Sequence, residues 1–104
     1  MIETIKKLLG MGPKVDLANV IANGGIIIDV RTPGEFAGGN VKGSLNIPLA
    51  SLNSQMQKLK KDKPIITCCA SGMRSSSAKS TLQANGFKEV YNGGSWYNLK
   101  KFER

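Results

Sequence analysis

Two continuous apolar runs constrain the fold of this chain more than any other feature. The first spans residues 26–30 (IIIDV) and the second spans residues 64–68 (PIITC). Neither run alternates apolar with polar residues, and β-branched residues dominate both, which is typical of strands covered on both faces. The chain must therefore supply helices for two sides of one sheet.

The segments between these runs supply the expected helices and further strands. Helices are predicted over residues 15–22, 52–59 and 75–85, and a shorter one opens with Thr32 as its cap and Pro33 at the first helical position. Short strands are predicted at residues 44–48 and 89–91, with a turn at residues 92–95. Strands alternating with helices imply an α/β fold with a mostly parallel sheet, in which ligands bind at the carboxyl ends of strands.

Length and charge limit the possible classes of protein. A chain of 104 residues supports one compact domain, which we place at residues 13–104 after a short helix or extension at residues 1–12. The net charge is +8, but no aromatic residues are interleaved with the lysines, so we predict a solvated surface and no nucleic-acid partner. No apolar run is long enough for a signal peptide or a membrane span. We therefore expect a cytoplasmic protein with reduced thiols.

A cysteine-containing loop directly follows the second apolar run. Residues 68–75 read Cys-Cys-Ala-Ser-Gly-Met-Arg-Ser. Small residues let backbone N–H groups converge on an anion, and the following helix adds its positive end, so the loop favours a thiolate over a thiol. The chain contains no histidine, so a Cys–His dyad is excluded and activation must come from amides, the helix dipole and Arg74. Two adjacent cysteines indicate neither a disulfide framework nor a zinc site, and we predict no metal and no cofactor.

The order of these pieces resembles single-domain rhodaneses, a family of sulfurtransferases. The resemblance covers about residues 15–99 and is carried by residues 29–36, 41–48 and 69–75, by Gly86-Phe87, and by Gly93-Gly94 with Trp96. It implies a rhodanese-like fold with a central, mostly parallel sheet of about five strands and helices on both faces. Asn40 is a departure, because the family usually has a histidine there.

The resemblance also implies a persulfide mechanism and assigns its residues. Cys69 attacks the outer sulfur of a small anionic donor, such as thiosulfate or a persulfide, and a thiol, cyanide or a protein then accepts that sulfur. We expect a monomer or weak dimer. The predicted substrate-binding loop comprises Ala70, Ser71, Gly72, Met73, Arg74 and Ser75. Asp29, Arg31 and Glu35 are predicted to form a supporting ion-pair group that holds the neighbouring loop.

The cysteine doublet leaves a question of register. Counted from Cys69 the loop is Cys-x4-Arg, whereas from Cys68 it is Cys-x5-Arg, the signature of cysteine-dependent phosphatases and arsenate reductases. Three points favour Cys69: the strand register makes it the first loop residue, Thr67 replaces the histidine that usually precedes a phosphatase cysteine, and no general acid is identifiable. Cys68 is then expected to be a buried packing residue, with a protective reaction partner for Cys69 as the sharper hypothesis. A non-catalytic rhodanese-like binding module is the remaining alternative.

Overall fold

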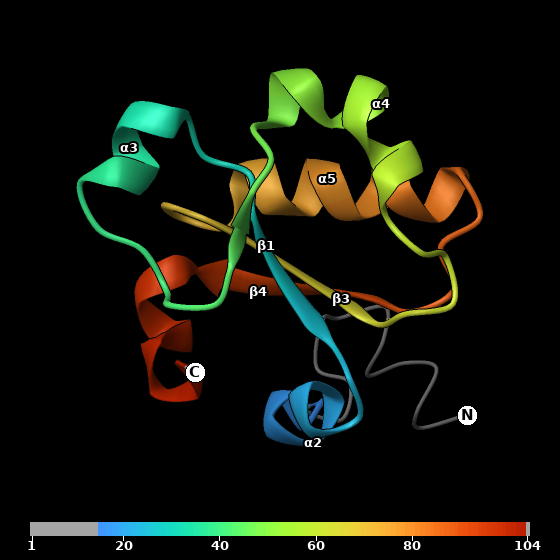
Figure 1. Ribbon diagram of the computed structural model, residues 1–104, viewed down its shortest axis with the longest axis horizontal. Helices are drawn as coiled ribbons and strands as arrows, with labels where there is room; N and C mark the ends of the chain where they lie inside the picture. The colour runs from blue at the N-terminus through green and yellow to red at the C-terminus, as the bar shows by residue number, and fades with distance from the viewer. Residues whose placement is uncertain (1–14, 104) are drawn as a thin grey trace, which may run out of the picture.

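The computed structural model describes residues 15–103, in which one parallel sheet is covered by helices on both faces (Figure 1). The strands lie in the order β2-β1-β3-β4, and all neighbours are parallel. Their bounds are Ile26–Asp29 for β1, Leu45–Asn46 for β2, Ile65–Cys69 for β3 and Val90–Ser95 for β4. The predicted α/β class is confirmed, and the described residues contain four strands where about five were expected. The predicted extension at residues 1–12 lies outside the described residues.

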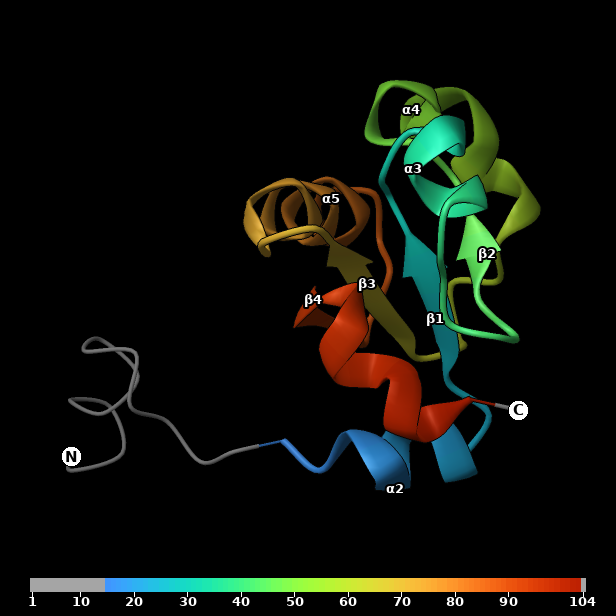
Figure 2. The ribbon, with the colours of Figure 1, turned by 90° about the vertical axis from the view of Figure 1, so that its left-hand side faces the viewer.

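Helices pack on the sheet from two sides and divide the core into two clusters. Helices α4 (Leu52–Gln55) and α5 (Met73–Ala84) cover one face, and α2 (Leu17–Ala22) and the 3₁₀-helix η3 (Trp96–Phe102) cover the other (Figure 2). The cluster on the α5 side contains Ile28, Val30, Leu52, Ile65, Cys69, Leu82 and Phe87 among its buried residues. The cluster on the α2 side contains Val20, Ile27, Val41, Ile66, Cys68 and Leu99. Because successive side chains of a strand point to opposite faces, the two adjacent cysteines belong to different halves of the core.

Side-chain caps start the first two helices, and the cap at Thr32 was predicted. Asp16 caps α2, with its carboxylate accepting a hydrogen bond from the Asn19 backbone, so the helix starts after residue 16 rather than at residue 15. Thr32 caps α3 (Pro33–Ala37) in a complete capping box with Glu35. This box fixes the position of Glu35 at the carboxyl end of β1.

Helix α5 begins two residues earlier than predicted. Gly72 has φ +105°, a conformation that side chains rarely adopt, and it turns the chain so that the helix starts at Met73. Met73 and Arg74 therefore belong to the first helical turn and not to the loop. The helix ends at Ala84, one residue before the predicted end.

Two other predicted elements are shorter than expected. The helix predicted over residues 52–59 is confined to α4, between the 3₁₀ segments η1 (Leu49–Ser51) and η2 (Met56–Lys58). Only Leu52 of α4 is fully buried and no side chain caps the start of this helix, so little holds a longer helix together. The strand predicted at residues 44–48 forms only the two pairs of β2 with β1.

The turn predicted at residues 92–95 is wrong, because these residues continue strand β4. A side chain at Gly93 would lie 2.9 Å from Ile66 and from Leu99, so this glycine serves close packing between the sheet and η3. The extension of β4 brings Asn92 and Gly94 beside the cysteine loop. No helix in the described part of the chain is long and apolar enough to cross a membrane.

Candidate functional site

Cys69 is the last residue of β3, at the carboxyl end of the sheet and directly before the turn into α5. It was predicted as the first loop residue, but an irregularity in the pairing between Thr67 and Cys69 lets it pair with Ser95 of β4. Its side chain is fully buried. The sulfur therefore lies beneath the loop that follows it.

Backbone amides from the cysteine loop and from the first turn of α5 donate hydrogen bonds to the Cys69 sulfur. The backbone N–H of Gly72 donates to Sγ at 2.9 Å, and that of Ser75 donates at 3.4 Å. Burial alone would raise the pKa of the Cys69 thiol, but hydrogen bonds from Ser75, Gly72 and Ser71 outweigh it and lower the pKa below the usual value. The predicted anion-binding loop thus stabilises negative charge on the sulfur itself.

A polar network that the sequence prediction missed supports this loop from β4. Asn92 Oδ1 lies 2.6 Å from the Ser75 hydroxyl, and Asn92 Nδ2 donates to the Gly72 carbonyl at 3.2 Å. Thr67 adds a hydrogen bond from Oγ1 to the Ser75 carbonyl at 2.9 Å. The sequence placed Asn92 in a turn, and only the parallel pairing of β4 with β3 shows that it reaches the site.

Arg74 is held by Glu35 in a bidentate ion pair. The two guanidinium nitrogens lie 2.7 and 3.0 Å from the two carboxylate oxygens, and each side chain is 36% exposed. The hydrogen bonds from Arg74, with that from the Thr32 backbone, lower the pKa of Glu35 to about 2. Glu35 was predicted to join Asp29 and Arg31, and this is wrong for its carboxylate. Because the capping box fixes Glu35 at the start of α3, its carboxylate reaches α5.

Asp29 and Arg31 form the predicted buried pair, which Glu35 joins only through its backbone carbonyl, the acceptor of a hydrogen bond from Arg31 Nη1 at 3.3 Å. Arg31 donates from Nε and Nη2 to the Asp29 carboxylate at 2.8–3.0 Å, and Nη2 also donates to the Gly39 carbonyl at 2.7 Å. The guanidinium lies 4.5 Å from the centre of the Trp96 ring, on the α2 side of the sheet. This enclosed group connects the loop after β1 to η3 and so has the contacts of a structural ion pair.

The remaining predicted loop residues face solvent. Ala70 and Ser71 are exposed, and Met73 is 79% exposed. Asn40, where a histidine was expected, donates from its side chain to the Phe36 carbonyl at 2.8 Å and so braces the end of α3. An amide thus holds the chain at this position, next to the helix that carries Glu35.

Cys68 has the opposite environment to Cys69. It is fully buried, it packs in the α2-side cluster with Ile66 and Leu99, and it forms no disulfide. Burial, followed by the negative charge of Asp29, raises the pKa of Cys68 to about 12. The structure therefore gives this thiol the features of a packing residue.

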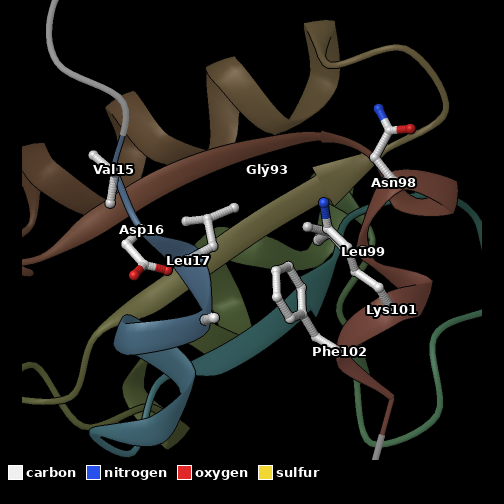
Figure 3. Close-up of a pocket in the computed structure, with 9 residues that line it drawn as sticks. Val15, Asp16, Leu17, Gly93, Asn98, Leu99, Lys101 and Phe102 are labelled. Atoms are coloured by element: carbon white, nitrogen blue, oxygen red, sulfur yellow. The ribbon is translucent and has the colours of Figure 1, made fainter.

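Three cavities in the described chain are not lined by Cys69 itself, although one of them has Asn92 in its lining. One of about 280 Å³ opens between the start of α2 and η3, where Leu17, Leu99 and Phe102 converge with Asp16 and Lys101 at its edge (Figure 3). Two others, of about 510 and 260 Å³, adjoin Val15 and Tyr91. None of the three is lined by the cysteine loop.

Comparisons with known proteins agree with this arrangement. The family model described as a Rhodanese-like domain matches residues 14–100. An uncharacterized Bacillus subtilis protein, YqhL, is 44% identical over 66 residues, which are 64% of this chain and 52% of that protein. The thiosulfate sulfurtransferase GlpE of Ectopseudomonas mendocina is 37% identical over 70 residues, covering 67% of this chain and 64% of the relative. The matches thus span between half and two thirds of these relatives' own length.

Solved structures give the same family. A human single-domain sulfurtransferase superposes with a TM-score of 0.72 at 26% identity, covering 85% of this chain and 92% of that one. The family model covers most of the chain, and the site lies where parallel α/β sheets place ligands. The chain belongs to the rhodanese-like domain family.

Proposed function

We propose that this protein transfers a sulfane sulfur through a persulfide on Cys69. The observation that carries the proposal is the convergence of backbone amides from the cysteine loop and the first turn of α5 on Sγ of Cys69, with the N–H groups of Gly72 and Ser75 at 2.9 and 3.4 Å. These donors favour an anionic sulfur, and both the attacking thiolate and the persulfide are anionic. The relatives named thiosulfate sulfurtransferase support the same chemistry.

The two half-reactions balance without a proton-transfer group. The Cys69 thiolate attacks the outer sulfur of thiosulfate, the sulfur–sulfur bond of the donor breaks, and its electron pair leaves with sulfite. A thiolate or cyanide acceptor then attacks the outer sulfur of the Cys69 persulfide, and the Cys69 thiolate is the leaving group. No step requires a histidine, which agrees with a chain that has none.

Arg74 is the proposed binding group for the anionic donor. Its guanidinium is about one third exposed in the first turn of α5, and its two terminal nitrogens are occupied by Glu35. An incoming anion must share or displace that carboxylate, since a guanidinium has a limited number of donors. Glu35 therefore competes with the anionic donor for the guanidinium of Arg74.

The alternatives receive less support. A phosphatase or arsenate reductase would use Cys68, but this thiol is buried in the α2-side cluster with its pKa raised to about 12. A pure binding module would not need a sulfur surrounded by amide donors. The partners proposed are accordingly a small anionic sulfur donor and a thiol, cyanide or protein acceptor.

Intact-mass measurement after incubation with thiosulfate tests the proposal. We expect an adduct of one sulfur atom on the wild type and on Cys68→Ser, and none on Cys69→Ser. Subsequent incubation with cyanide should remove the adduct. An adduct that persists in Cys69→Ser but disappears in Cys68→Ser would overturn the assignment, and phosphatase turnover without any sulfur adduct would favour the alternative.

A further inference from the structure

The Ser75 hydroxyl is the centre of a hydrogen-bond network beside the reactive sulfur. Its Oγ lies 2.6 Å from Asn92 Oδ1, 3.0 Å from the Gly72 carbonyl oxygen and 3.6 Å from Cys69 Sγ. A hydroxyl carries one proton, and the first two neighbours can only accept. The direction of that proton therefore decides whether Ser75 stabilises the sulfur or another group.

While Cys69 is a protonated thiol, Asn92 determines the direction of the Ser75 hydroxyl proton. The Gly94 N–H donates to Asn92 Oδ1 at 2.9 Å, and Asn92 Nδ2 donates to the Gly72 carbonyl, so the amide oxygen must face Ser75. The contact to Oδ1 is the shortest that the hydroxyl makes, and its proton lies along it. The thiol of Cys69 then donates its own proton to the Ser75 oxygen.

Loss of the thiol proton reverses this arrangement. An anionic sulfur can only accept, so the hydroxyl can donate to it only by leaving Asn92 Oδ1. That oxygen does not become unpaired, because it keeps the hydrogen bond from Gly94. Turning the hydroxyl therefore costs its hydrogen bond to Asn92, and this cost depends on how strongly residue 92 accepts the proton.

We propose that Asn92 is a positioning residue that sets the direction of the Ser75 hydroxyl proton and thereby tunes the reactivity of Cys69. The proton points to Asn92 while Cys69 is a thiol and to the sulfur when Cys69 is a thiolate. The inference rests on the proposed function only in taking Cys69 as the reactive thiol. Strand β4, which lies outside the cysteine loop, thereby contributes a residue that influences Cys69.

The substitution Asn92→Asp tests this role through the pKa of the Cys69 thiol. A carboxylate accepts the hydroxyl proton more strongly than an amide does and no longer donates to Gly72, so both effects oppose the thiolate. In a Cys68→Ser background, the pKa obtained from iodoacetamide rate against pH should rise by about one unit, which slows alkylation about tenfold below the pKa. When Ser75→Ala is also present, the shift should fall to less than half, because only the through-space effect of the charge and the lost hydrogen bond to Gly72 remain.

Control variants separate the role of Asn92 from a general effect of added charge. Asn98→Asp places the same charge at an exposed position of η3 and should leave the pKa of Cys69 nearly unchanged. Ser75→Gly also removes the hydroxyl and replaces Ser75→Ala if that variant does not fold. Equal shifts with and without the hydroxyl, or no shift in either background, would overturn the inference. Alkylation needs no sulfur transfer, so a failed sulfur-adduct experiment and a failed Asn92 experiment remain distinguishable.

Discussion

The two sides of the sheet shift the pKa values of two neighbouring cysteines in opposite directions. Cys69 on the α5 side accepts hydrogen bonds from loop amides, which lower its pKa despite burial. Cys68 on the α2 side lies in an apolar cluster near Asp29, and its pKa rises to about 12. One step along a strand thus changes both the face and the chemistry of a thiol. Neighbouring residues of the same type need not share a function.

The ion pairs on the two sides of the sheet also have different surroundings. Asp29–Arg31 on the α2 side is enclosed, whereas Glu35–Arg74 beside the cysteine loop is about one third exposed. Removing one partner of an enclosed pair is costly because the remaining charge stays away from water. An exposed pair can open, which would leave Arg74 available for the proposed anionic donor. The following substitutions test whether structure and function divide along this line.

The largest expected effect is on stability, at Arg31. The substitution Arg31→Met leaves the Asp29 carboxylate buried without its guanidinium and should lower the free energy of unfolding by about 3–5 kcal/mol. Denaturant unfolding measures this change. The control Lys100→Met breaks the exposed pair with Glu103, at 3.6 Å, and should cost far less. Similar losses for the two variants would show that enclosure does not distinguish the ion pairs.

Arg74 should instead affect activity. We expect Arg74→Gln to lower kcat/KM for thiosulfate roughly a hundredfold to a thousandfold, the scale found when one charge-stabilising donor is removed. Its thermal and denaturant unfolding should change little, because the ion pair with Glu35 is partly solvated. Steady-state transfer from thiosulfate to cyanide measures the first quantity. A variant that unfolds readily yet keeps its kcat/KM would reverse the assigned roles.

Alkaline pH should change the free energy of unfolding in opposite directions through the two cysteines. The folded pKa of Cys68, about 12, lies above the ordinary 9.0, so the contribution of Cys68 to the free energy of unfolding is lost as pH rises from about 9 towards 12. By about pH 10.5 the loss relative to Cys68→Ala should reach about 2 kcal/mol. Cys69 has a lowered pKa, so its contribution rises with pH up to the unfolded value. Denaturant unfolding of Cys68→Ala and Cys69→Ala at about pH 8 and about pH 10.5 compares them; equal pH slopes would contradict the account.

The smallest expected effect is at Glu35. Glu35→Gln keeps an acceptor for the capping box with Thr32 but removes the charge that competes for Arg74. The KM for thiosulfate should fall about twofold to fivefold with little change in kcat, the scale of an exposed ion pair. With its pKa at about 2, Glu35 is charged at any ordinary assay pH. Glu103→Gln serves as the control, and a rise in KM specific to Glu35→Gln would mean that this carboxylate assists donor binding.

Prediction from the sequence succeeded where local patterns determine structure. The apolar runs predicted β1 and β3, and the Thr32 cap and the cysteine loop are readable from neighbouring residues. Prediction failed where the outcome depends on contacts between distant segments. Gly93 resembled a turn residue until its packing against η3 was known. The partner of Glu35 and the role of Asn92 depend on how α3 and β4 lie against α5.

The pH dependence of alkylation, measured for each cysteine alone, shows directly whether the two thiols differ in pKa as their surroundings indicate. Cys69 is followed in Cys68→Ser, and Cys68 is followed in Cys69→Ser, with rates measured from neutral to alkaline pH. We predict that Cys69 titrates below the pKa of an ordinary thiol, and that folded Cys68 stays unreactive throughout the range in which Cys69 titrates. A Cys68 that titrates at or below the pKa of Cys69 would contradict it.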